Sequence, residues 1–417
     1  MLRINPALFL LSLPFSLQAQ ESYSIVVDRS FSMVSGAENL LTIDRGAWTL
    51  ENKFIPPSWF DEQPVVGKVA GVAFRFAKTV ALDQVIDQYT CLLQHEVFGH
   101  GAKAREYGMN DITYTLNLSY PYGSGQGTTF GVSPDDNPIS QDQYILYNTG
   151  GVEANAILSK HIVLNWLQRG AINFRETFLY ERASNDLTQY LWETKWGKSG
   201  VEGNDMLEYE RAVNAREGLF DPAEYKLTVN DLAKQAFVIC LDPFQYFSLY
   251  TFFKTYLYSG EESFEFPMID MGSTKYLPSF HLGLTPFGSE IYLDNYVVRS
   301  SKVIDLYFRY GIPSFHRSWG LGINGLNVIN SDPFSFDVRF DIWNQPVVTI
   351  YDYNTYLSRG GLGGALSCAA YANLVQTFAT IRLIVEVETK TVGYLPGEPL
   401  GDAVVLRLGL NLVLEAH

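Results

Sequence analysis

The stretch "SFDVRFDIW", Ser335 to Trp343, decides the fold predicted for the second half of the chain. Apolar and polar residues alternate along it with a period of two, the period at which side chains of a β-strand point to opposite faces. One face would carry Phe336, Val338, Phe340 and Ile342, and the other Ser335, Asp337, Arg339 and Asp341. The stretch therefore predicts a β-strand with one apolar face and one charged face.

The same alternation recurs along the whole C-terminal part of the chain. Eight segments show it, near residues 278–286, 288–299, 301–311, 317–327, 333–344, 359–371, 376–391 and 401–415. Several of them are longer than the five or six residues usual for strands of globular proteins. Strands of about nine to eleven residues are typical of sheets that cross a membrane at a tilt.

Two architectures would explain these strands. A soluble β-sandwich also alternates apolar with polar residues. In these segments a uniformly apolar face lies opposite a face that mixes acids and bases. This arrangement favours a barrel, in whose narrow interior the charged side chains would form ion pairs. The segment "GSEIYLDNYVVRSSKVIDLYFRYG", residues 288–311, resembles a pair of outer-membrane barrel strands joined by a short turn. We therefore predict an antiparallel all-β domain over residues 263–417, as an eight-stranded membrane β-barrel or, alternatively, a β-sandwich.

The part of the chain before the strands is predicted to be helical, which makes the fold class α+β. Apolar residues recur there at steps of three to five, and a helical domain is expected over residues 65–262. Within it we expect a long helix over 78–108, a hairpin or loop over 112–132, and helices over Gln141–Arg169, Phe174–Thr194, Asp205–Arg216 and Val229–Tyr258.

The N-terminal residues indicate export. Residues 1–19 begin with Arg3, continue with an apolar run and end at Ala19, as a cleaved secretory signal peptide does. Residues 20–64 are predicted to be an extended segment. We expect the protein in the outer membrane of a Gram-negative-type cell, or in the periplasm or outside the cell if the β domain is soluble.

Composition narrows the classes of partner. The formal net charge of -15 argues against a nucleic-acid partner, because neutralising phosphates requires a surplus of Lys and Arg. Three widely separated cysteines, an odd number, do not predict a disulfide framework.

The motif "HEVFGHG", His95 to Gly101, carries the chemistry that the sequence predicts. Hydrolysis by zinc requires imidazole or carboxylate ligands and a nearby carboxylate that accepts a proton from water. On a regular α-helix, residues five apart are turned about 140° from each other, so His95 and His100 would point in different directions. One extra residue can be accommodated as a π-bulge, and Gly99 and Gly101 supply the backbone freedom that a bulge requires.

The motif resembles the HExxGH motif of the dipeptidyl peptidase III family of zinc peptidases, which has the same extra residue. The resemblance implies a gluzincin-type site in which His95 and His100 bind Zn²⁺ and Glu96 activates water. It also implies a glutamate from a later helix as the third ligand. The best match for this residue is Glu153 in "GGVEANAIL", and Cys91, four positions before His95, is the alternative.

These observations predict a zinc-dependent hydrolase, a metallopeptidase that cleaves a peptide or protein substrate and is attached to the outer membrane. One alternative is an outer-membrane β-barrel protein whose helical insert holds a structural metal site without catalysis. The other is a soluble, secreted hydrolase with a β-sandwich module.

Overall fold

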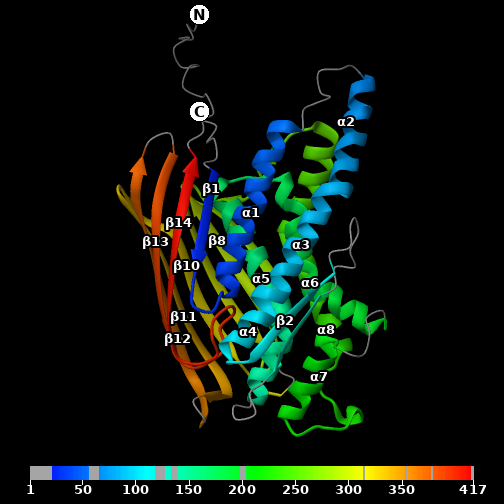
Figure 1. Cartoon of the computed structure of the whole chain (residues 1–417), viewed down its shortest axis with the longest axis vertical. Coiled ribbons are helices and arrows are strands. Elements are labelled where there is room, and N and C mark those ends of the chain that lie inside the picture. Colours follow the sequence, from blue (N-terminus) through cyan, green and yellow to red (C-terminus); the bar gives the residue numbers. More distant parts are fainter. Residues whose placement is uncertain are drawn as a thin grey trace, which may run out of the picture.

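The computed structural model describes residues 21–55, 65–117, 127–132, 139–197, 203–312, 315–352, 355–376 and 379–414. A long antiparallel sheet forms one side of the molecule, and a group of helices packs against its concave face (Figure 1). The mixed helical and antiparallel character predicted from the sequence is thereby confirmed. The predicted signal peptide, residues 1–19, lies outside the described residues.

The sheet has ten strands in the order β1-β14-β13-β12-β11-β10-β9-β8-β7-β6. Eight of them match the eight predicted segments: β7 Lys275–Thr285, β8 Gly288–Arg299, β9 Lys302–Gly311, β10 Trp319–Ser331, β11 Phe334–Asp352, β12 Thr355–Gln376, β13 Ala379–Lys390 and β14 Ala403–Leu414. The remaining two are the short β6 Ile269–Asp270 and the N-terminal β1 Glu21–Val27. Among the described residues β1 does not pair with β6, so the predicted closed eight-stranded barrel is not found there.

The segment predicted to be extended, residues 20–64, is a strand followed by a long helix in its described part. β1 pairs with β14, with Ser24 opposite Asn411. Helix α1, Met33–Phe54, begins at Ser32, whose side chain accepts a hydrogen bond from the amide of Ser35. The N-terminal segment before the predicted helical domain thus contributes one edge strand, β1, to the sheet.

The other helices lie close to the predicted ranges. They and the minor strands are α2 Val65–Lys78, η2 Thr79–Asp83, α3 Gln84–His95, η3 Glu96–His100, α4 Gly101–Glu106, β2 Asn110–Leu116, β3 Gly127–Val132, α5 Gln141–Arg169, β4 Ile172–Asn173, η4 Phe174–Glu176, α6 Thr177–Lys195, α7 Asp205–Arg216, η5 Pro222–Glu224, α8 Val229–Gln235, η6 Ala236–Leu241, α9 Pro243–Tyr250, η7 Thr251–Ser259 and β5 Ser263–Phe264.

The predicted single helix over Val229–Tyr258 is wrong, because the chain bends at Asp242. Pro243 has no amide hydrogen and cannot continue the preceding turn, whereas it is well suited to the first position of a new helix. Asp242 starts α9 by accepting a hydrogen bond from the amide of Phe244. Among the described helices none alone is long and apolar enough to cross a membrane. The bent pair Pro222–Leu241 and Pro243–Ser259, at 62°, meets the criteria of length and composition.

Helix α5 lies at the centre of the molecule, between the sheet and the other helices (Figure 1). A capping box of Ser140 and Gln143 fixes its first turn, and Gly170 ends it in the left-handed conformation. Along its C-terminal half, Leu158, Ile162 and Trp166 are buried in a core shared with α6 and with strands β7 to β9. Helix α5 is therefore a buried element against which the other helices and the sheet pack.

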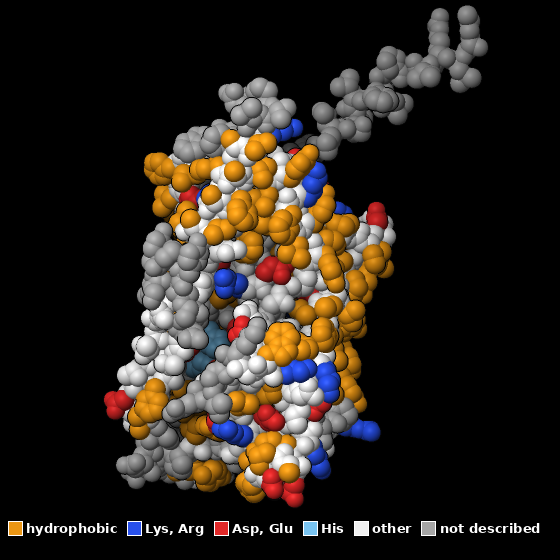
Figure 2. Space-filling model, turned by 90° about the vertical axis from the view of Figure 1, so that its right-hand side faces the viewer, with side chains coloured by type: hydrophobic (Ala, Val, Ile, Leu, Met, Phe, Trp, Pro, Cys, Tyr) orange, Lys and Arg blue, Asp and Glu red, His pale blue; other side chains and the backbone are white. Residues whose placement is uncertain are grey.

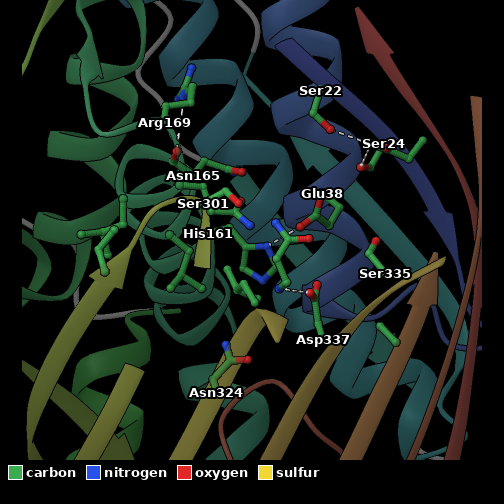
Figure 3. Close-up of a pocket in the computed structure, with 18 of the residues that line it drawn as sticks. Ser22, Ser24, Glu38, His161, Asn165, Arg169, Ser301, Asn324, Ser335 and Asp337 are labelled. Atoms are coloured by element: carbon green, nitrogen blue, oxygen red, sulfur yellow. Dashed lines mark hydrogen bonds and ion pairs between the residues drawn. The ribbon is translucent and has the colours of Figure 1, made fainter. Parts of the chain in front are cut away.

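The two faces of the sheet have inverted polarity. The concave face buries charged side chains, and the convex face exposes aliphatic and aromatic ones. On β14 the side chain of Arg407 is 1% exposed, whereas its neighbour Leu408 is 44% exposed. Between the concave face and helices α1 and α5 lies a cavity of about 1100 Å³, and polar residues such as Ser24, Asn165 and Asp337 line it (Figure 3).

Candidate metal centre

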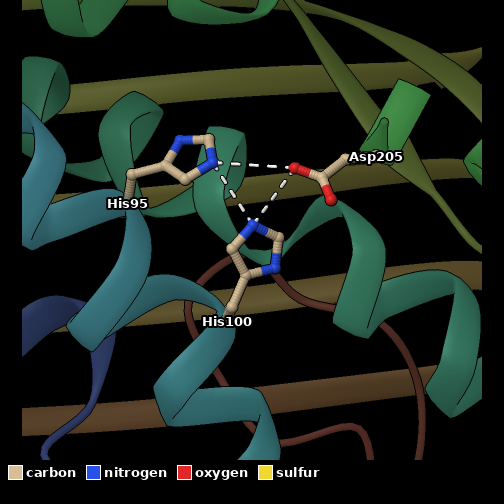
Figure 4. A group of neighbouring side chains, drawn as sticks. All are labelled: His95, His100 and Asp205. Atoms are coloured by element: carbon tan, nitrogen blue, oxygen red, sulfur yellow. Dashed lines mark hydrogen bonds and ion pairs between the residues drawn. The ribbon is translucent and has the colours of Figure 1, made fainter. Parts of the chain in front are cut away.

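The π turn predicted between the two histidines is present. Residues Glu96–His100 form the π-helical turn η3 between α3 and α4, and the amide of Gly101 donates to the carbonyl of Glu96, five residues earlier. The wider turn changes the angle between residues five apart, so His95 and His100 point toward the same place (Figure 4). This local irregularity is what makes the spacing of five compatible with a shared ligand.

Three side chains converge at this point: His95, His100 and Asp205. The Nε2 atoms of His95 and His100 are 3.2 Å apart, and Oδ2 of Asp205 lies 3.8 Å from the first and 3.3 Å from the second. Tetrahedral ligands at the usual zinc bond lengths lie about 3.3 Å from one another, by the geometry of that coordination. The triangle therefore has the size that a tetrahedral metal ion requires.

The outer nitrogens of both imidazoles contact hydrogen-bond acceptors. Nδ1 of His95 lies 3.0 Å from Oδ2 of Asp186, which also accepts a hydrogen bond from the side-chain Nδ2 of Asn155 at 2.8 Å. Nδ1 of His100 lies 2.7 Å from the carbonyl oxygen of Tyr147. A carboxylate and a carbonyl can only accept, so each Nδ1 carries the proton, and each neutral ring presents its Nε2 lone pair to Asp205. When both rings are neutral, three acceptors face one another, and a metal ion among them would offset their repulsion; without a metal, added protons on the rings do so.

The pKa values of the three residues also indicate that positive charge is favoured within the triangle. Burial alone would lower the pKa of both imidazoles, but nearby carboxylates reverse this effect. Asp186 and Asp205 raise the pKa of His95 well above its usual value, and Asp205 raises that of His100. In return, the two imidazoles lower the pKa of Asp205, although burial opposes them. Without a metal, protons occupy the place that a metal ion would take.

Glycines on α5 allow this helix to approach the π turn closely. A Cβ atom on Gly151 would overlap Nε2 of His95, so only glycine leaves room for that imidazole. A Cβ atom on Gly99 would lie 2.6 Å from the carbonyl oxygen of Gly150. The "GG" of Gly150 and Gly151 thus has a structural reason that the sequence alone did not reveal.

Glu96 lies at the start of η3 and is buried beneath the β2-β3 hairpin. Its Oε2 accepts a hydrogen bond from the hydroxyl of Thr129 at 2.7 Å, and Gly127 of β3 leaves space for its side chain. The charge of Glu96 acts on both imidazoles and raises the pKa of each. A carboxylate is therefore held next to the triangle without being one of its three members.

The two predicted candidates for the third ligand lie elsewhere. Glu153, on α5, accepts a hydrogen bond from the amide of Gly397 at 2.7 Å and does not belong to the triangle. Cys91 is buried in the main core, where its thiol contacts the carbonyl oxygen of Leu179 at 3.9 Å. His100 follows His95 by five positions, a spacing that the sequence shows directly. Which carboxylate reaches the two histidines depends instead on how the helices pack, and Asp205 takes the place expected for Glu153.

Asp205 is the site residue that sequence reasoning missed. It is the first residue of α7, after the helix cap Asn204, and its amide donates to the hydroxyl of Tyr190 at 3.0 Å. The helix dipole favours a carboxylate at this end. An acidic residue in the first turn is common in helices, so nothing in the sequence marked Asp205 as a ligand.

The triangle is accessible from the helical side of the molecule. The side chains of His95 and Asp205 keep 13% and 23% of their surfaces exposed, whereas His100 is buried. On the same side the surface has a hollow with histidine side-chain surface at its floor (Figure 2). The triangle is therefore partly exposed to solvent among the described residues.

Comparison of the chain with family models, curated proteins and solved structures gave no match.

Proposed function

We propose that the protein is a zinc-dependent hydrolase, a metallopeptidase whose Zn²⁺ is held by His95, His100 and Asp205. The observation that carries this proposal is the convergence of three acceptors at zinc-like separations, with both outer imidazole nitrogens directed at acceptors. The likeness of "HEVFGHG" to the motif of the dipeptidyl peptidase III family supports it. Three protein ligands would leave a fourth position for water, as in catalytic rather than structural zinc sites.

Each residue of the site has a distinct role in the proposed reaction. When bound, zinc would acidify water and polarise the carbonyl of a scissile peptide bond. Glu96 would accept the proton of the attacking water and deliver it to the leaving amine, because its carboxylate lies beside the triangle and Thr129 holds it in place. Asp186 and the carbonyl of Tyr147 would keep both histidines in the ligating tautomer.

We also propose that the sheet attaches this hydrolase to the outer membrane, with its convex face in contact with lipid. Exposed aliphatic side chains and a buried, charged concave face are the arrangement found in membrane sheets. The β12 strand has 22 residues and β11 has 19, which exceeds the length that a membrane-spanning strand requires. The described strands would thus be the membrane part that the sequence predicts as a barrel.

Glu96→Gln tests the hydrolase proposal. The amide keeps the shape and the hydrogen bond from Thr129 but cannot accept the proton, so peptide turnover should fall by about 10² to 10⁴. Zinc content, measured by elemental analysis, should stay at the wild-type value. Glu224→Gln in η5, an exposed acidic position on the helical part of the molecule, is the control and should leave both turnover and zinc unchanged.

Turnover and zinc content together separate the alternatives. A Glu96→Gln variant that retains both zinc and full turnover would contradict the role of Glu96. A wild-type protein that binds zinc and cleaves no member of a diverse peptide library would favour the structural metal site instead. A protein that purifies with iron would point to a different chemistry, because two histidines and one carboxylate also suit that metal.

A further inference from the structure

Apolar side chains are exposed on the helical side of the molecule as well as on the convex face of the sheet. They gather over the upper half of the helical side (Figure 2). The exposed residues are Ile43, Leu50 and Phe54 on α1, Val69 and Phe76 on α2, Phe237 and Leu241 on η6, Tyr246, Leu249 and Tyr250 on α9, and Phe253 and Tyr258 on η7. So large a group on one part of the surface marks a site of contact with a partner or a membrane.

Apart from Lys68, which is exposed, helix α2 has the same inverted polarity as the sheet. Its outward residues include Val69, which is 68% exposed, and Phe76, which is 55% exposed. Its inward residue Arg75 is 1% exposed, and the guanidinium donates to the carbonyl oxygen of Leu257 on η7 at 2.9 Å. A helix in water places its charges outward and its apolar residues inward. The opposite arrangement is expected where the surroundings of the helix are apolar.

Helices α9 and η7 continue this surface. One exposed stripe runs along α9 into η7, because its residues recur at steps of three or four: Tyr246, Leu249, Tyr250 and Phe253. Lys254 lies beside the stripe, with its ammonium 4.1 Å from the centroid of the Tyr258 ring. Lysines near the end of a membrane helix extend their amines to the headgroups, so this charge is compatible with lipid around the stripe.

The helices also cover the free edge of the sheet. β1 is an end strand, and α1 packs against it. Thr42 accepts from the amide of Ser24 and donates to its carbonyl oxygen, both at 2.7 Å. Asn39 accepts from the amide of Val26 at 2.7 Å and donates to its carbonyl oxygen at 2.8 Å. Side chains of a helix thus satisfy the backbone groups that another strand would bind in a closed barrel.

At the opposite end of the sheet, η6 and α9 pack against β7, and α2 packs against η7. The helices therefore occupy the space between the two ends of the open sheet. In a bilayer, an open sheet edge is tolerated only where protein covers it and satisfies its backbone groups. The contacts of Asn39 and Thr42 meet this condition at β1.

We propose that α1, α2, η6, α9 and η7 form a lipid-facing wall that closes the open sheet, so that the bilayer surrounds helices and strands alike. This inference rests on the proposed membrane location of the sheet. The partner of the exposed helical side is then the acyl chains of phospholipids. Inverted polarity favours lipid over a second protein, since a polar inner surface beneath an apolar outer one is typical of a membrane body.

The native cysteines allow a direct test. Cys240 is exposed on η6, within the proposed wall, and Cys368 is exposed on the convex face of β12, while Cys91 is buried. Nitroxide labels would be placed on Cys240 in a Cys368→Ser variant, on Cys368 in a Cys240→Ser variant, and at Leu50→Cys and Arg211→Cys in the double Ser variant. The full chain would be placed in vesicles of phosphatidylethanolamine and phosphatidylglycerol, and collisions with oxygen and with a water-soluble nickel chelate would be compared.

We expect the labels at Cys240, Leu50→Cys and Cys368 to collide severalfold more with oxygen than with the nickel chelate, because oxygen concentrates among acyl chains. The label at Arg211→Cys, on the exposed surface of α7, should show the reverse. If the label at Cys368 collides mainly with oxygen while the labels at Cys240 and Leu50→Cys collide mainly with the nickel chelate, the helical wall is overturned and the membrane sheet stands. Low collision rates with both reagents at the helical labels would also overturn it, in favour of a protein partner. A water-like result at Cys368 would contradict the membrane location itself.

Discussion

The His95–His100–Asp205 triangle and the surroundings of Glu153 are two buried polar regions that both lie against α5, and they differ in the source of their positive charge. Beside Glu153 the chain itself provides a cation, Lys103. Burial raises the pKa of the Glu153 carboxyl, and the charge of Lys103 opposes this rise. Around the triangle, the groups that pair with Asp205 are the two imidazoles. Lys103 therefore supplies positive charge to Glu153 from within the chain, although Oε2 of Glu153 has no hydrogen-bond partner among the described residues. Around the triangle the positive charge beside Asp205 comes from protons on the imidazoles or, when both imidazoles are neutral, has to come from a metal ion.

Gly151→Ala should have the largest effect on this comparison. The added Cβ atom would occupy the position of the His95 imidazole, so metal affinity should fall by about 100-fold or more. The matched control is Gly46→Ala on α1, where a Cβ atom meets nothing within 4 Å. Competition with a zinc-binding dye would measure both. Equal affinities of the two variants would show that His95 is not a ligand.

Asp186→Asn should have a smaller effect at the same site. The amide can still contact Nδ1 of His95, but it no longer bears the charge that orients and polarises this ring. Removing such a partner typically weakens metal binding about 10- to 100-fold. The same dye competition measures it, with Asp231→Asn at an exposed position of α8 as the control. An unchanged affinity would show that the hydrogen bond has no part in ligation.

Metal affinity should depend on pH because protons compete for the triangle. The pKa values of His95 and His100 are raised in the metal-free protein, so both imidazoles are protonated below those values and must lose protons to bind a metal. Affinity should therefore rise by about tenfold per pH unit for each proton released. The folding free energy that these charged imidazoles contribute is present below about pH 6.5 and lost as the pH rises through their raised pKa values. Titrations that show no dependence on pH would contradict this account of the site.

Glu153→Gln should change stability and leave metal binding as it is. Its carboxylate accepts from the amide of Gly397, and a Gln oxygen can still do so. Burial and the charges of Glu106 and Glu398 raise the pKa of this carboxyl despite the attraction to Lys103. We expect the neutral side chain to raise the free energy of unfolding at neutral pH, measured by chemical denaturation, because it removes a charge that the folded state disfavours. Bound zinc should remain at the wild-type level. Loss of zinc at unchanged stability would restore Glu153 as the ligand.

Much of the fold follows from periodicity, which local sequence carries. The alternation of residues 333–344 predicted β11, and the helical spacing predicted α5 with both of its ends. The pairing of β1 with β14 could not be predicted, because it joins the two ends of the chain. The sequence indicated a closed barrel because it does not show what covers the end strand β1. In the structure, side chains of α1 bond the backbone groups of β1 that a further strand would otherwise bond.

The site was predictable where its geometry is local. The spacing of His95 and His100 and the glycines between and after them predicted the π turn. The choice between Glu153 and Asp205 depends on how α5 and α7 pack against that turn, and single-sequence patterns do not encode this packing. Gly150 and Gly151 are the one indication in the sequence that α5 approaches closely, and they point to proximity without naming a ligand.

The most direct test of the central claim is the metal content of four purified proteins, measured by elemental analysis: wild type, His95→Ala, Asp205→Ala and Glu153→Ala. The triangle predicts about one zinc ion per chain in the wild type and in Glu153→Ala, if the latter folds, and little or none in His95→Ala and Asp205→Ala. Circular dichroism of each variant would establish that it is folded. Full zinc content in a folded Asp205→Ala protein, or its loss in a folded Glu153→Ala protein, would contradict the assignment.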